Sequence, residues 1–318
     1  MKVLVTGGAG YIGSYAVKAL LRQNHEVVVL DNLSTGSEEA LVKDIPFYKG
    51  DIRDSNVLDE IFINEKIDLV MHFAAKLIAP ESIQYSLEYY DNNVNGVNSL
   101  LTSMKKHNVT KIVFSSTAAV YGLLDKELIN ENDITNCINP YGETKLASEK
   151  MIQWSHKSYG LEYIIFRYFN VAGGKKTGYS PLNQTVLIPR ILNVAKGLVD
   201  KVTIFGNDYN TIDGTCIRDF IHVEDLVNAH ILAAEGLFNG TTEVGIYNLG
   251  NGKGFSVLET YETAKKVTGI NIPFEFSERR IGDPVKSVAS SEKAQKNLGW
   301  KPKYDKLEEI ILDAWENY

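Results

Sequence analysis

Cysteine is scarce in this chain of 318 residues, which contains only Cys137 and Cys216. They lie far apart and form no Cys-x-x-Cys pair, so the sequence offers neither a disulfide framework nor a cysteine-based zinc site. The six histidines form no His-x-x-x-His pattern and no cluster with cysteine, and we therefore expect no metal. Two unpaired thiols are typical of a reducing compartment, so we expect a cytoplasmic protein.

Long apolar runs and an excess of positive charge are also missing. No stretch approaches the length of a transmembrane helix, and no basic-then-apolar signal region opens the chain, so we expect no membrane partner. The formal net charge of −7 argues against a general nucleic-acid binder. What is present is an ordinary globular composition, 44% hydrophobic and 23% charged, in a chain long enough to bury a large core.

The first residues of the chain contain the clearest local pattern. Residues 2–6 are a β-branched apolar run that predicts a buried parallel strand, and residues 12–20 have apolar residues at helical spacing. Between them, Gly7, Gly10 and Gly13 allow a sharp turn, a close approach of a pyrophosphate and close packing of the helix on the strand. Because a helix N-terminus attracts phosphate, this turn predicts a dinucleotide site; the alternative is a glycine turn that binds nothing.

An acidic residue follows the second predicted strand, residues 26–30. Asp31 lies about 20 residues past the glycines, where a carboxylate accepts hydrogen bonds from the adenosine ribose. A carboxylate there repels the 2′-phosphate of NADP, so we predict NAD as the cofactor, although loop aspartates at strand ends are common. A third strand at 46–49 leads into Asp51 and Ile52, which we expect to lie against the adenine.

Strands and helices alternate through the first half of the chain, with helices beginning near Tyr89 and Tyr141. Further strands are predicted at 68–73, 111–116 and 163–168. This alternation predicts a doubly wound α/β (Rossmann) parallel sheet with right-handed crossovers. The periodicity weakens after Asn170. We therefore expect residues 1–170 to form an NAD-binding domain, to which some later segments return, and residues 171–318 to form mainly a smaller mixed α/β substrate lobe.

A tyrosine and a lysine four residues apart begin the helix near residue 141. Tyr141 and Lys145 lie one above the other on one helix face. A phenol is a poor base at neutral pH, and a neighbouring ammonium group and a nicotinium ring would both favour the phenolate. Lowering the pKa of the phenol by about 3 units needs roughly 4 kcal/mol. Thr117, just after the strand 111–116, is positioned to relay a proton or hold a substrate hydroxyl, unless it merely caps the strand end. His72, inside an apolar strand, is expected in the core.

With these residues the chain resembles the extended short-chain dehydrogenase/reductases, and most closely the UDP-glucose 4-epimerase family. The matching stretches of the first half are 5–14, 30–33, 50–53, 72–75, 89–94, 114–122 and 139–142. Those of the second half are 167–170, 204–209, 213–215, 217–223, 247–250 and 279–283. The first half is shared by the superfamily, whereas the stretches 213–223 and 279–283 are much more specific to the epimerases.

The resemblance implies that resident NAD⁺ takes a hydride from C4 of a UDP-sugar and returns it to the other face of a 4-keto intermediate, which interconverts UDP-galactose and UDP-glucose. Tyr141 would take the proton of the 4-hydroxyl, Lys145 would hold the nicotinamide ribose, and Thr117 would contact the 4-hydroxyl. The cofactor-binding residues implied are Gly7, Gly10, Tyr11, Ile12, Gly13, Asp31, Asn32, Asp51, Ile52, Phe73, Ala74, Ala75, Asn92, Ser115, Tyr141, Lys145 and Phe169. The substrate-binding residues implied are Thr117, Asn170, Phe205, Arg218, Arg280, Asp283 and Ser287.

The same resemblance assigns roles to the second half of the chain. Arg218 and Arg280 would clamp the diphosphate, because a guanidinium group matches phosphate oxygens in a fork. Asp283 would accept from the uridine ribose, and Asn170 would donate to phosphate or sugar. For Arg280 the alternative is a solvated surface arginine. The helices beginning near Gln84 and Tyr141 would form the face of a homodimer, as they do in the superfamily.

The sequence also departs from the family. Leu77 stands where some members have a lysine that contacts the cofactor, and Val186 stands where some have Asn or His before Leu-Ile-Pro. The segment between Asn170 and Pro189 is shorter than in some members. Ser287, at the position that restricts the sugar in members with a bulky residue there, leaves space for a 2-N-acetyl group. We therefore hypothesise that UDP-GlcNAc and UDP-GalNAc are also substrates.

Two other functions remain open at this point. A nucleotide-sugar 4,6-dehydratase shares the fold, the tyrosine and the lysine, but it needs an acid and a base that its family places directly after the threonine. Ala118 and Ala119 stand there, so elimination lacks its catalysts. A non-catalytic NAD-binding regulator is a known use of this fold, but such proteins usually lose the tyrosine or the lysine.

Overall fold

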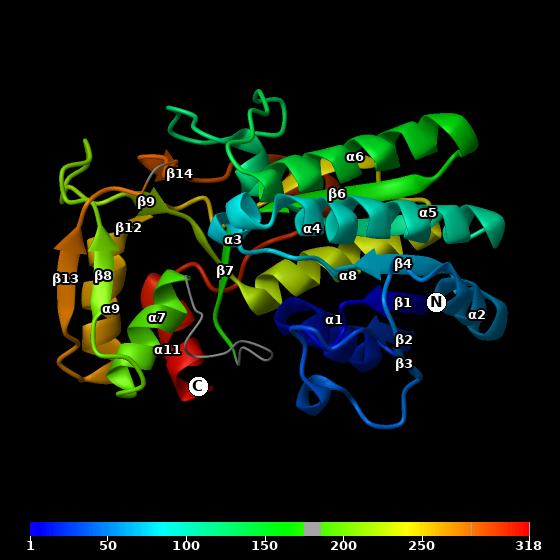
Figure 1. Cartoon of the computed structure of the whole chain (residues 1–318), viewed down its shortest axis with the longest axis horizontal. Helices are drawn as coiled ribbons and strands as arrows, with labels where there is room; N and C mark the ends of the chain where they lie inside the picture. The colour runs from blue at the N-terminus through cyan, green and yellow to red at the C-terminus, as the bar shows by residue number, and fades with distance from the viewer. Residues whose placement is uncertain (175–185, 281, 318) are drawn as a thin grey trace.

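The computed structural model describes residues 1–174, 186–280 and 282–317. Its centre is a seven-stranded sheet in the order β11-β6-β5-β4-β1-β2-β3, in which every neighbouring pair is parallel (Figure 1). The strands are β1 (Lys2–Thr6), β2 (Glu26–Asp31), β3 (Phe47–Lys49), β4 (Leu69–His72), β5 (Lys111–Thr117), β6 (Glu162–Tyr168) and β11 (Gly245–Leu249). The predicted doubly wound parallel sheet is therefore confirmed, and the six predicted strands agree with the structure to within one residue at each end.

Helices cover both faces of this sheet because alternate residues of each buried strand point to opposite sides. On one face, Val3 and Val5 pack against α1 (Tyr11–Arg22) and α8 (Val223–Asn239). On the other face, Leu4 packs in a core with α2 (Ser55–Glu65), α5 (Gly96–Lys106) and α6 (Pro140–Tyr159). Short helices complete this lobe: α3 (Ala79–Gln84), α4 (Ser86–Tyr90) and two 3-10 turns, Glu38–Ala40 and Ala118–Tyr121.

The helix expected to begin near Tyr89 begins earlier, at Ser86, and it is not regular. A π-helical turn, Asp91–Asn95, joins α4 to α5. Neither Tyr85 nor Asn95 makes a side-chain capping hydrogen bond, so no local capping signal marks these boundaries. π-Helical turns are rare and frequently lie at functional sites, because they change the direction in which neighbouring side chains point.

The second lobe contains short strands and helices around its own core. The strands are β7 (Asn170–Ala172), β8 (Val202–Phe205), β9 (Ile217–Arg218), β10 (Phe220–His222), β12 (Phe255–Ser256), β13 (Phe274–Ser277) and β14 (Lys286–Ser287). The helices are α7 (Leu187–Ala195), α9 (Val257–Thr268) and α11 (Leu307–Glu316), whereas α10 (Glu292–Leu298) packs against α8 and β11 in the first lobe. Ile191, Ile204, Tyr261 and Ile310 form part of this core, which lies to the left of the large sheet in Figure 1.

Segments from beyond residue 170 also complete the first lobe. The strand β11 pairs with β6 at one edge of the large sheet, and α8 packs against α1. The sequence patterns did not predict β11. The division of the chain into two domains at residue 170 stays a prediction. The later segments β11 and α8 belong with the large sheet, as expected from the sequence for some segments beyond residue 170.

None of the helices in the described part of the chain is long and apolar enough to cross a membrane. Within residues 1–174, 186–280 and 282–317, the structure contains no group of three His, Cys, Asp or Glu side chains that could hold a metal.

Candidate active site

The predicted glycine turn joins β1 to α1 and forms a tight cradle. Gly7 has a φ of +75°, and a Cβ there would lie 2.6 Å from the backbone nitrogen of Ala74. A Cβ at Gly13 would lie 2.1 Å from the carbonyl oxygen of Gly7, so only glycine allows α1 to pack this closely. At Gly10, the N-cap of α1, a Cβ would meet only the Gly7 oxygen, at 3.3 Å, and the N-cap makes no side-chain capping hydrogen bond. This geometry fits a pyrophosphate at the helix N-terminus.

Asp31 and Asn32 lie beside this cradle at the end of β2. The buried Asp31 carboxylate accepts hydrogen bonds from the backbone N–H groups of Ala9, at 3.0 Å, and Leu33, at 2.8 Å. Each oxygen keeps acceptor capacity for a ribose hydroxyl, because a carboxylate has about four acceptor positions. Asn32 donates from its amide to Asp51, at 2.9 Å. The structure therefore brings together the residues that we expect to contact adenosine.

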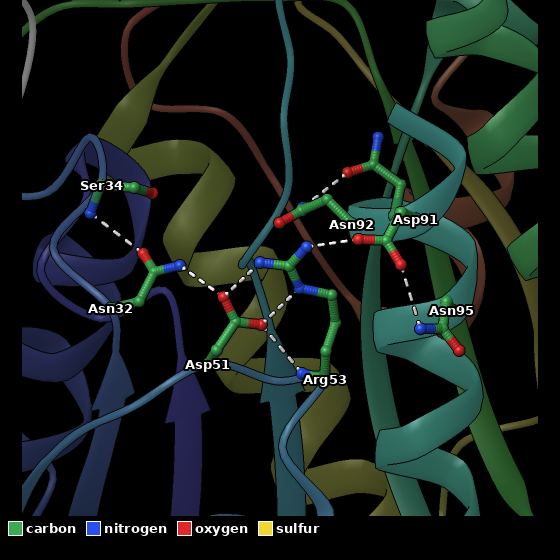
Figure 2. A network of polar contacts seen from close by, with 8 residues as sticks. Asn32, Ser34, Asp51, Arg53, Asp91, Asn92 and Asn95 are labelled. Atoms are coloured by element: carbon green, nitrogen blue, oxygen red, sulfur yellow. Dashed lines mark hydrogen bonds and ion pairs between the residues drawn. The ribbon is translucent and has the colours of Figure 1, made fainter. Parts of the chain in front are cut away.

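Asp51, which we expect to lie against the adenine, has a partner that the sequence reasoning missed. Arg53 donates to Asp51 from its backbone nitrogen, its Nε and its Nη2, at 2.9, 2.8 and 2.8 Å (Figure 2). This hydrogen bonding holds the pKa of the Asp51 carboxyl well below its usual range. Arg53 also forms an ion pair with Asp91. Arg53 belongs to the family-matching stretch 50–53, but nothing in the sequence pairs it with a residue 38 positions away.

Lys145 lies deep in the site, and its geometry agrees with the expected placement beside the cofactor. Its side chain is 4% exposed, and its Nζ donates to the carbonyl oxygen of Ser115 at 2.8 Å. Burial lowers the pKa of Lys145 to about 7, and the carboxylate of Glu149 opposes this shift. The ammonium group also lies 5.1 Å from the ring centroid of Phe114.

Tyr141 and Thr117 meet at the carboxyl end of β5. Burial raises the pKa of Tyr141, and a side-chain hydrogen bond with Thr117 opposes that effect. Within the chain itself, burial therefore outweighs the hydrogen bond, and the prediction that a neighbouring ammonium group and a nicotinium ring together favour the phenolate stays a prediction. Burial also makes the charged form of Lys145 costly, so the lysine provides less positive charge near neutral pH than an exposed one would.

A buried ion pair supports the catalytic helix, and the sequence reasoning missed it. Glu149, one turn after Lys145 on α6, accepts from Arg167 of β6, at 2.6 Å from Nη2, and from the hydroxyl of Ser116. Both charged side chains are almost completely buried. The only available sequence signal was the spacing of four residues between Lys145 and Glu149 on one helix face. Because Ser116 lies between Ser115 and Thr117, this cluster fixes the end of β5 against α6.

The end of β6 places two further residues at the site. The Tyr168 hydroxyl is hydrogen-bonded to Ser115, and burial raises the pKa of Tyr168. Phe169, which is buried, follows it directly. Tyr168 was not among the expected residues, although it belongs to the family-matching stretch 167–170. His72 lies in the core as expected, because it is 1% exposed and its Nδ1 lies 2.8 Å from Thr6 Oγ1.

Apart from Thr117 at the end of β5, the expected substrate residues lie beyond residue 169, most of them in the second lobe. Arg218 of β9 pairs with Ser287 of β14, and its Nη2 lies 3.5 Å from Asp283. Its Nη1 is anchored by the carbonyl oxygens of Ile217 and Pro284, at 2.9 and 2.8 Å. Asn170 donates its amide to the carbonyl oxygen of Asp219, at 3.2 Å.

Arg280 and Phe205 form a separate contact. The guanidinium carbon of the exposed Arg280 lies 3.9 Å from the centroid of the Phe205 ring, so the side chain packs on an aromatic face instead of extending freely into water. Gly282 lies close to Ile138, two residues before the start of α6. This contact brings the 279–283 motif near the helix that carries Tyr141. The family departure between Asn170 and Pro189 falls largely on residues 175–185, outside the described part of the chain.

Comparisons with known proteins agree with this geometry. Residues 3–250 match the NAD dependent epimerase/dehydratase family. The UDP-glucose 4-epimerase of Halalkalibacterium halodurans is 54% identical over 99% of this chain and 95% of its own length.

Solved structures give the same result. A crystal structure of a UDP-glucose 4-epimerase has a TM-score of 0.96 and 50% identity, and covers 100% of this chain and 97% of its own. The Bifidobacterium longum enzyme, solved with NAD⁺ and UDP, has a TM-score of 0.92 and 36% identity, with 100% and 98% covered. These matches agree with the glycine cradle and the Tyr141–Lys145 pair. The chain belongs to the NAD-dependent epimerase/dehydratase family, and within that family it is similar to the UDP-glucose 4-epimerases.

Proposed function

We propose that this chain interconverts UDP-galactose and UDP-glucose, with NAD⁺ as a resident cofactor. One observation carries the proposal: Tyr141, Lys145 and Thr117 meet at the carboxyl end of β5, in the same lobe as a glycine cradle suited to a dinucleotide. The carboxyl ends of parallel strands are where open α/β sheets bind such ligands. NAD⁺ supplies the redox chemistry at C4 of the sugar when it is bound.

Three residues of the chain would handle the proton of the sugar 4-hydroxyl. Tyr141 accepts it at its phenolic oxygen, and Thr117 holds the hydroxyl in line with that oxygen. Lys145 is held by Ser115, and its remaining N–H donors are available to a ribose hydroxyl. Because burial raises the pKa of Tyr141, the phenolate needs positive charge nearby, and the protonated form of Lys145 provides part of it.

The second lobe would bind the nucleotide. Arg218 is fixed by two carbonyl oxygens and by Asp283, which leaves part of its guanidinium fork for a diphosphate. Arg280, supported by the Phe205 ring, would add a second positive charge. A firmly held nucleotide leaves the sugar free to turn between the two half-reactions.

The 4,6-dehydratase alternative has no support from the site. Ala118 and Ala119 form the 3-10 turn directly after Thr117. They occupy the positions at which a dehydratase needs its acid and base, and methyl groups transfer no protons.

The test is to incubate the purified protein with UDP-galactose and no added NAD. We expect UDP-glucose to form, NAD to be released on denaturation, and Tyr141→Phe to lower kcat by about 10²–10⁴-fold. A 4-keto-6-deoxy product would identify a dehydratase. No reaction with any nucleotide sugar, despite bound NAD, would identify a regulator.

We also infer a homodimer and a cytoplasmic location. A groove of about 350 Å³ lies between α5 and α6 and is lined by Leu101, Met151 and Trp154, among others. The Trp154 side chain is 67% exposed, which is unusual for a large aromatic group on a monomer. A second copy of the chain that covered α5 and α6 would bury this surface. The two free cysteines, Cys137 and Cys216, fit a reducing compartment.

A further inference from the structure

Arg53 connects two segments that lie far apart in the sequence. Its Nε and Nη2 each lie 2.8 Å from an oxygen of Asp51, which forms a two-point contact, and its Nη1 is bonded to Asp91. Asp51 is in the loop between β3 and α2, and Asp91 begins the π-helical turn between α4 and α5. Figure 2 shows the guanidinium group between the two carboxylates, with Asn32 on the far side of Asp51.

Both connected segments carry residues that we expect to bind the cofactor. Asp51 is the expected adenine contact, and Asn92, directly after Asp91, is another expected contact of the cofactor. Within the π-helical turn, Asn95 donates to Asp91 at 3.2 Å and Asn92 donates to Asn93 at 3.0 Å.

The turn is also tied to the catalytic helix. The buried Asn93 amide donates to Thr144 of α6, at 3.1 Å, and to the carbonyl oxygen of Lys76, at 3.0 Å. Thr144 in turn donates to the carbonyl oxygen of Tyr141, at 2.8 Å. Polar contacts therefore join the loop at Asp51 to the start of the π-helical turn, and a second set of contacts joins Asn93 of the same turn to α6. The backbone of the turn connects the two sets.

We propose that Arg53 is a positioning residue for the dinucleotide, because it fixes the adenine-side loop at Asp51 to the π-helical turn that carries Asn92. This inference rests on the proposed function, in which NAD binds along these segments. Arg53 itself need not contact the cofactor. It sets the distance between two contact points, so that the free protein already has the spacing that the extended dinucleotide requires.

The chemistry of the contact requires arginine. Asp51 and Asp91 would repel each other without the shared cation, and Arg53 also holds the pKa of Asp91 below its usual range. A lysine is a point charge and cannot bond two carboxylates through a planar fork. The side chains of Arg53, Asp51 and Asp91 are 39%, 25% and 50% exposed, and ion pairs this exposed contribute little to global stability. The effect of removing Arg53 should therefore fall on NAD binding and not on folding.

The test compares Arg53→Met and Arg53→Lys with the wild-type enzyme. NAD is removed, NAD affinity is measured by titration, and UDP affinity and the urea unfolding midpoint of the NAD-free protein are measured in parallel. We expect about tenfold weaker NAD binding for Arg53→Met, the loss typical of one charge-assisted hydrogen bond, and only partial recovery for Arg53→Lys. UDP affinity and the unfolding midpoint should stay at their wild-type values.

Lys266→Met is the matched control, since it removes another exposed ion pair, with Glu308 at 3.0 Å, in the second lobe. It should leave NAD affinity unchanged. The role proposed for Arg53 is overturned if Arg53→Met binds NAD with wild-type affinity. It is also overturned if the variant loses NAD affinity, UDP affinity and stability together. Either result leaves the proposed function of the chain unaffected. A wild-type protein that binds no NAD would overturn the proposed function, and this inference with it.

Discussion

At the scale of single residues, the fold shifts the proton equilibria of Lys145 and Tyr141 away from their values in water. The pKa of Lys145 is about 7 in the folded chain, against 10.5 for an exposed lysine. Burial raises the pKa of Tyr141 as well. Both groups therefore favour their neutral forms, and the charge needed for proton transfer depends on what binds beside them.

A pH dependence of stability follows for Lys145. Between about pH 7 and 10, the unfolded chain binds a proton that the folded chain does not, so the free energy of unfolding rises with pH. Below about pH 7 both states are protonated, and the folded state bears the full cost of the buried charge. Relative to Lys145→Met, the wild type should gain roughly 4 kcal/mol across this range, measured by urea unfolding of the NAD-free protein.

Lys150→Met, which changes an exposed lysine of the same helix, is the control and should show no such gain. A difference between wild type and Lys145→Met that stays constant from pH 7 to 10 would contradict the lowered pKa of Lys145.

Ser287 is the residue on which we expect the range of sugar substrates to depend. Ser287 has a small side chain, and its backbone pairs with that of Arg218, beside the expected diphosphate site. We expect wild-type protein to convert UDP-GlcNAc, and Ser287→Tyr to abolish that activity because the phenol fills the space for the N-acetyl group. Turnover of UDP-galactose, measured with the same preparation, should remain. Equal loss of both activities would count against this role.

At the scale of elements, α6 is the helix on which the site depends, and its ends are well specified. Asn139 caps the N-terminus by accepting from the backbone N–H of Gly142, at 2.9 Å, and Pro140 occupies the first turn. Gly160 ends the helix in the left-handed conformation, with a φ of +80°. These local signals explain why the sequence predicted α6 closely, whereas α4 and the π-helical turn have no such caps.

Removing the cap of α6 should destabilise the protein. Asn139→Ala leaves the backbone N–H of Gly142 without its partner, and we expect a loss of about 1 kcal/mol in the free energy of unfolding, measured with urea. Asn139→Asp keeps an acceptor oxygen and should retain most of the stability. Ser158→Ala, at an exposed position near the other end of α6, should change it by less than about 0.5 kcal/mol. The expectation fails if Asn139→Ala is as stable as Ser158→Ala.

At the scale of the whole molecule, the exposed apolar residues of α4 and α6 are the basis for the homodimer that we propose. Leu87 and Trp154 are both largely exposed, and the groove between α5 and α6 continues this surface. Figure 1 shows α4, α5 and α6 running along one side of the large sheet, away from the second lobe.

The homodimer makes a clear prediction. Trp154→Glu places a charge on the groove and should convert a dimer to a monomer, measured by sedimentation velocity, because an unpaired buried charge is costly. Ile212→Glu changes an exposed apolar residue on the loop after β8 and should leave the dimer intact. A wild-type protein that sediments as a monomer at micromolar concentration would refute the interface.

Much of the site was predictable where its residues are close in sequence. The glycine turn, the acid at the end of β2 and the Tyr141–Lys145 pair depend on spacing within one strand, turn or helix, which sequence patterns report directly. The pair Glu149–Arg167 and the bridge from Arg53 to Asp91 were missed. Their members come from different elements and meet only when the sheet has formed.

The sequence by itself determined the class of sheet and the choice of cofactor, because local periodicity, glycine spacing and side-chain chemistry are properties of short stretches. It also predicts the catalytic residues. Only the tertiary structure decided the charge state of the site. Burial is the sum of contributions from many distant segments, and it raises the pKa of Tyr141, an effect that the spacing of residues along the sequence does not report. The tertiary structure also decided that β11 and α8, from beyond residue 170, complete the first lobe. Strand pairing and helix packing stabilise contacts between segments regardless of their separation along the chain.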